Sequence, residues 1–132
     1  MASPPHRAPK KILIVDDEYA IRILLKTFLE GYHYIVQIAE DIENAVQIFR
    51  EFHPDLIISD IMMPMDTGLS LIARIRGLSP SIKVIYLSAW LDESETEIKL
   101  QQELLEHSSY KMIQKPFHLD TLLEIVQKYL EE

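Results

Sequence analysis

The sequence predicts an α/β fold, a doubly wound three-layer sandwich in which helices cover both faces of a five-stranded parallel sheet. Short β-branched segments alternate with longer segments of helical spacing, and this alternation is typical of βαβ units. Several short segments are apolar nearly throughout, as expected for strands covered on both faces. The 132 residues suffice for one such domain. We expect it at 11–132, after a flexible leader at 1–10 that contains three prolines and little to bury.

Five β-branched segments are the expected strands. The first, third and fourth consist mainly of isoleucine, leucine and valine, whereas the second and fifth also carry polar residues. By residue number the strands are expected at 12–15, 34–38, 56–59, 83–88 and 110–114.

The segments between these strands have the apolar pattern i, i+3, i+4, i+7 of helices with one buried face. In the first of them the apolar positions are Ile21, Leu24, Leu25 and Phe28. The same pattern recurs at 42–49 and 119–126, and a shorter version at 71–78 ends before Pro80. Residues 91–106 include six acidic residues and only a thin apolar stripe, so we expect a fifth, mostly solvated helix there.

The composition excludes several kinds of protein. There is no cysteine, which excludes disulfides, thiolate metal sites and thiol catalysis. Lys and Arg total 13 against 21 Asp and Glu, a net charge of −8, and so acidic a domain repels the phosphates of nucleic acids. Apolar runs are only four or five residues long, too short to cross a membrane. We expect a cytoplasmic protein without direct nucleic-acid or membrane binding.

Chemically active side chains stand where the expected strands end. Asp16 and Asp17 follow the first strand, Asp60 follows the third, Ser88 ends the fourth and Lys115 follows the fifth. In a parallel sheet these ends meet at one rim, where ligands bind. Crowded carboxylates repel one another unless a cation lies among them, and Mg²⁺ prefers such oxygen ligands. A carboxylate beside Mg²⁺ and a lysine is suited to accept a phosphoryl group.

Four motifs carry a family resemblance. The runs ILIVDDE, DLIISDIMMPMDTG, VIYLSA and KPF occur in this order at the ends of strands. Together they resemble the receiver domain of the response regulators of bacterial two-component (phosphorelay) signalling, over residues 11 to about 130. The resemblance implies a flavodoxin-like sheet with strand order 2-1-3-4-5.

The resemblance also implies roles for the acidic residues. Asp60 would accept a phosphoryl group from a sensor histidine kinase or a phosphotransfer protein. Asp16, Asp17 and Asp60 would bind Mg²⁺, with the main-chain carbonyl of Met62 as a further ligand. The chain would then be a phosphoprotein switch rather than a conventional enzyme.

Two further residues have implied roles in switching. Ser88 would supply the switch hydroxyl, and Lys115 would pair with the phosphate, aimed by a cis peptide bond before Pro116. Phosphorylation would change binding of a downstream protein at the face of the fourth and fifth strands. A second copy of the chain, forming a homodimer, is the alternative partner.

The sequence departs from the family pattern in two places. Many receivers carry an aromatic residue three positions before the lysine, where this chain has Met112, and the nearest aromatic is Tyr110. Ser88 and Lys115 are 27 residues apart, about five more than is typical. These departures keep a second interpretation open, in which the chain is a pseudo-receiver that binds a protein without being phosphorylated.

Overall fold

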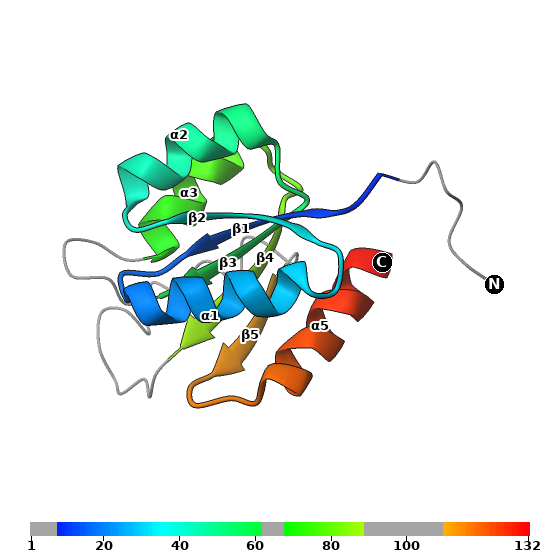
Figure 1. The fold of residues 1–132 in the computed structure, drawn as a ribbon. Coiled ribbons are helices and arrows are strands. Elements are labelled where there is room, and N and C mark those ends of the chain that lie inside the picture. The colour runs from blue at the N-terminus through cyan, green and yellow to red at the C-terminus, as the bar shows by residue number, and fades with distance from the viewer. Residues whose placement is uncertain (1–7, 62–67, 89–109) are drawn as a thin grey trace.

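The computed structural model describes residues 8–61, 68–88 and 110–132. Five strands and four helices lie in these ranges (Figure 1). In chain order the elements are β1 (Lys11–Val15), α1 (Tyr19–Glu30), β2 (Ile35–Ala39), α2 (Ile42–Phe52), β3 (Leu56–Asp60), α3 (Gly68–Leu78), β4 (Lys83–Ser88), β5 (Tyr110–Gln114) and α5 (Leu119–Glu131).

The strands form one parallel sheet in the order β2-β1-β3-β4-β5. This confirms the predicted fold class and strand order. The second strand runs one residue later than expected, and the other four agree with their predicted positions to within one residue at each end. The expected helix at 91–106 lies outside the described residues.

The sheet is covered on both faces by helices (Figure 1). Helices α2 and α3 bury their apolar residues against one face, and α1 and α5 bury theirs against the other. Successive side chains of a strand point to opposite faces. In β1, Leu13 and Val15 therefore belong to the core beneath α2 and α3, while Ile12 and Ile14 belong to the core beneath α1 and α5.

Helix α2 begins and ends with local signals that the sequence carries. The side chain of Asp41 accepts a hydrogen bond from the Asn44 backbone N–H at 2.8 Å, which is an N-cap. At the other end His53 adopts the left-handed conformation, with φ of 54°, and its N–H donates to the Phe49 carbonyl. These caps fix where the chain leaves β2 and enters β3.

The buried face of α1 differs from the predicted apolar stripe. Leu25 is fully buried, but Leu24 is 48% exposed, and the buried positions are Arg22, Leu25 and Leu29. The helix is thus rotated relative to the expected stripe, and an arginine faces inward. An arginine can lie there because its guanidinium bonds to a main-chain carbonyl at the end of β1.

None of the helices in the described ranges has both the length and the apolar character needed to cross a bilayer.

Candidate functional site

Five side chains from four strand ends are placed at one rim of the sheet. Asp16 and Asp17 follow β1, Asp60 ends β3, Ser88 ends β4 and Lys115 follows β5. Carboxylate oxygens of the three aspartates all lie within 4.8 Å of one another. The parallel sheet therefore brings together the three carboxylates as the sequence predicts.

Every polar group of Asp16 takes part in a hydrogen bond. Its N–H donates to the Ala39 carbonyl at 3.2 Å, and its carbonyl accepts from Arg22 Nη1 at 2.6 Å. One carboxylate oxygen accepts from the Glu18 N–H at 2.8 Å, and the other accepts from Lys115 Nζ at 3.3 Å. The side chain is fully buried. Asp16 is therefore a fixed part of the rim.

The ammonium of Lys115 lies between two aspartates. Nζ is 3.3 Å from Oδ2 of Asp16 and 3.3 Å from Oδ2 of Asp60. Burial lowers the pKa of Lys115, but the charges and hydrogen bonds of the two aspartates outweigh it, and the pKa is raised above its usual value. The Lys115 N–H donates to the Ser88 carbonyl at 2.6 Å, and the peptide bond to Pro116 is cis, as predicted.

The other rim residues differ in their exposure. Asp60 is 5% exposed and Ser88 is 3% exposed. Asp60 is paired in the sheet with Leu87, so Ser88 lies one residue beyond the neighbour of Asp60. Asp17 is exposed and gives the site an opening to solvent. Met62, the fourth predicted metal ligand, lies outside the described residues.

The donor set of this rim fits a hard divalent cation such as Mg²⁺. All three clustered groups are carboxylates, and Mg²⁺ takes oxygen ligands, a few of them carboxylates, and keeps several waters. One lysine near three carboxylates leaves an excess of negative charge that a cation would offset. Asp17, Asp60 and Asp16 are the residues that could hold it.

Arg22 also lies at this rim, although no pattern in the sequence predicts it there. It is 8% exposed, and its guanidinium lies 5.6 Å from the centre of the Tyr19 ring. A cation on an otherwise apolar helix face gives no periodicity signal. The one available clue is that Arg22 lies one helical turn after the DDE run, within reach of the acidic loop.

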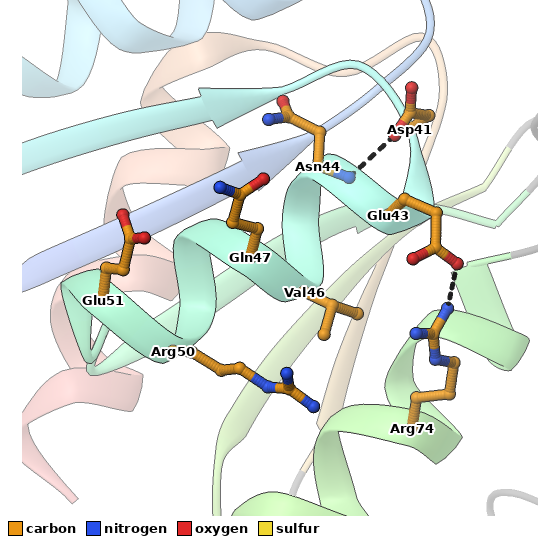
Figure 2. Close-up of a pocket in the computed structure, with 8 residues that line it drawn as sticks. All are labelled: Asp41, Glu43, Asn44, Val46, Gln47, Arg50, Glu51 and Arg74. Carbon is orange, nitrogen blue, oxygen red and sulfur yellow. Dashed lines mark hydrogen bonds and ion pairs between the residues drawn. The ribbon is translucent and has the colours of Figure 1, made fainter.

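Apart from the rim, a polar hollow lies between α2 and α3 (Figure 2). Glu43 of α2 and Arg74 of α3 reach across it and form an ion pair of 2.7 Å. The hydrogen bond and charge of Arg74 hold the pKa of Glu43 below its usual value. Both side chains are largely exposed, so the pair links two helices at the surface.

Tyr110 and Met112 of β5, which lie at or near the position of the family's aromatic residue, have different surroundings. Tyr110 is half-buried and packs against the core beneath α2 and α3, whereas Met112 is 37% exposed. Both side chains belong to the same face of the strand by alternation.

The fold and the rim together define a flavodoxin-like α/β protein with an acidic ligand site at the carboxyl ends of its strands. The sequence model of the response regulator receiver domain matches residues 12–127 of the chain. The chain therefore belongs to the response regulator receiver domain family, as its motifs predicted.

Individual relatives agree with this assignment. The chain is 35% identical over 123 residues to the sporulation initiation phosphotransferase F of Bacillus subtilis, with 92% of this chain and 94% of that protein covered. It is 32% identical over 124 residues to the regulatory protein AtoC of Escherichia coli, covering 94% of this chain but only 26% of AtoC. A CheY-like receiver domain protein of Methanospirillum hungatei JF-1 superposes with a TM-score of 0.83, at 28% identity, covering 94% of this chain and 95% of that one.

Proposed function

We propose that this chain is a phosphoryl-accepting signalling switch in which Asp60 is the acceptor. One observation carries the proposal: the buried Asp60 carboxylate lies 3.3 Å from an ammonium and within 4.8 Å of two further carboxylates. Family membership supports it, and one relative is named a phosphotransferase. The phosphoryl donor would be a sensor histidine kinase or a phosphotransfer protein, in the cytoplasm.

The residues of the rim would divide the reaction among them. A carboxylate oxygen of Asp60 forms the new O–P bond while the N–P bond of a phosphohistidine breaks. The imidazole, already protonated on its other ring nitrogen, leaves as a neutral base. Lys115 offsets negative charge on the transferring group, which is how a fixed cation favours such transfers. When bound, Mg²⁺ would neutralise charge on the phosphoryl oxygens. Asp16, Asp17, Asp60 and the Met62 carbonyl would hold it.

The output would be a change in partner binding at the face of β4 and β5. A phosphoryl group on Asp60 offers new oxygen acceptors close to the end of β4, where Ser88 stands. A shift of Ser88 or Lys115 toward these oxygens would favour one of two arrangements of that face over the other. The partner would be a downstream protein or a second copy of the chain. Receiver domains are switches rather than conventional enzymes, so we expect no chemistry beyond Mg²⁺-dependent self-phosphorylation and autodephosphorylation.

The test is the intact mass of the chain after incubation with acetyl phosphate, with and without Mg²⁺. We expect wild type to gain one phosphoryl group only when Mg²⁺ is present. Asp60→Asn should gain none, and Asp55→Asn should behave as wild type, because Asp55 lies at the opposite end of β3. If wild type gains no mass, the phosphoryl-switch proposal is wrong and the pseudo-receiver interpretation replaces it.

A further inference from the structure

A buried cation supports the acidic rim from the helix side. Arg22 is 8% exposed, and its Nη1 donates to the carbonyl of Asp16 at 2.6 Å. We propose that Arg22 is a positioning residue that sets the direction of the Asp17 carboxylate, and so the affinity of the rim for Mg²⁺. The proposal rests on the proposed function, since it concerns the same site.

The peptide bond between Asp16 and Asp17 connects the Arg22 guanidinium to the Asp17 side chain. A peptide unit is planar, so the direction of the Asp16 carbonyl also fixes the N–H and Cα of Asp17. Arg22 is bonded to that carbonyl, and the bond to a guanidinium is charge-assisted and stronger than a neutral one. The guanidinium therefore fixes the plane from which the Asp17 side chain departs.

Asp17 needs such indirect support more than the other two aspartates. Asp16 and Asp60 are each bonded to Lys115. Within the described residues the Asp17 carboxylate has no hydrogen bond or ion pair of its own, although its oxygen lies within 4.8 Å of the other two carboxylates. Its backbone is therefore the part of Asp17 through which neighbouring residues can place this side chain.

The surroundings of Arg22 hold its guanidinium in place. Its Cζ lies 5.6 Å from the centre of the Tyr19 ring, a distance typical of cation–π contacts. The bond of Nη1 to the Asp16 carbonyl at 2.6 Å offsets part of the cost of burying the positive charge. A neutral, unbranched side chain would occupy part of this space without fixing the carbonyl.

The experiment is a calorimetric titration of Mg²⁺ into the metal-free chain and its variants. We expect Arg22→Met to weaken Mg²⁺ binding by about 10-fold to 100-fold, the usual effect of losing a residue that orients a metal ligand. Arg22→Lys should recover most of the affinity, because a single nitrogen makes the bond to Asp16. If the arginine served only to fill space, Arg22→Lys and Arg22→Met would have similar affinities for Mg²⁺.

Lys26→Met is the matched control. Lys26 also belongs to α1 and also donates to a strand carbonyl, that of Val36 at 3.0 Å, but away from the rim. It should lose stability to urea without losing Mg²⁺ affinity. The unfolding free energy of each variant, measured in EDTA, separates a general loss of stability from an effect on the site.

The outcomes separate this inference from the proposed function. If wild type binds Mg²⁺ and Arg22→Met binds it within twofold of wild type, the positioning role is refuted even if Asp60 is phosphorylated. If Arg22→Met does not fold, the Mg²⁺ affinity of Arg22→Lys tests the positioning role instead. An affinity of Arg22→Lys as low as that of Asp17→Ala would refute the claim that one bond to the Asp16 carbonyl is sufficient. If wild type accepts no phosphoryl group but Arg22→Met still weakens Mg²⁺ binding, only the proposed function fails. Absence of Mg²⁺ binding by wild type overturns both.

Discussion

Neutralising Asp17 should stabilise the metal-free protein. In the absence of a cation, Asp17 contributes repulsion with Asp16 and Asp60 and, within the described residues, no hydrogen bond of its own. Asparagine has nearly the same shape, so Asp17→Asn removes the charge and little else. We expect a higher free energy of unfolding in EDTA, together with weaker stabilisation by added Mg²⁺.

The size of the effect follows from the spacing of the carboxylates. At the upper limit of their separation, 4.8 Å, two unit charges repel by about 3.5 kcal/mol at an effective dielectric of about 20, and by about 0.9 kcal/mol in bulk water. Asp17 is exposed, so solvent screening favours the lower value for each of its two pairs. We therefore expect a gain of about 1–2 kcal/mol at low ionic strength, and less at high salt.

The assay is urea unfolding followed by circular dichroism, in EDTA and in Mg²⁺. Glu51→Gln is the control for the change in net charge, because Glu51 is an exposed acid near the end of α2. It should leave the unfolding midpoint unchanged in both buffers. A variant Asp17→Asn that is less stable than wild type in EDTA would refute the reasoning, since repulsion would then not dominate at this position.

Three other substitutions have expected effects. Lys115→Met should cost about 2–3 kcal/mol in EDTA, because it leaves two buried carboxylates without their ammonium; an unchanged urea midpoint would contradict this. Asp41→Ala should cost about 1 kcal/mol by removing the N-cap of α2, measured in the same way. Burial raises the pKa of Tyr129 above its usual value of 10.0, so the folded state binds this proton more tightly than the unfolded state. Stability should therefore fall as the pH rises above about 10, and Tyr129→Phe should reduce that fall in alkaline unfolding curves.

Much of the fold could be predicted because it depends on patterns that a single chain displays. The strands β1, β3 and β4 are buried on both faces and are apolar nearly throughout, and α2 shows its buried face as Ala45, Val46 and Phe49. The strand order required the family resemblance, because periodicity does not say which strands are neighbours.

The site was predictable as a set of residues but not as a set of contacts. Residue types and strand ends place Asp16, Asp17 and Asp60 at one rim. They do not reveal that Lys115 lies equally close to two of the aspartates, since that distance depends on how the chain turns after β5. Arg22 escaped prediction because its partner is a main-chain carbonyl, which no side-chain pattern in a sequence can show.

The two adjacent aspartates at the end of β1 should tolerate substitution very differently. Asp16 uses one carboxylate oxygen for the Glu18 N–H and the other for Lys115, so the position requires two acceptors on one short side chain. Asparagine would present an amide donor to one of those two donors, and glutamate would need space for another methylene in a fully buried position. Asp17 faces solvent and can change without repacking. During evolutionary drift the first aspartate should therefore be retained even in chains that have lost phosphorylation, whereas the second should vary once the cation is no longer needed.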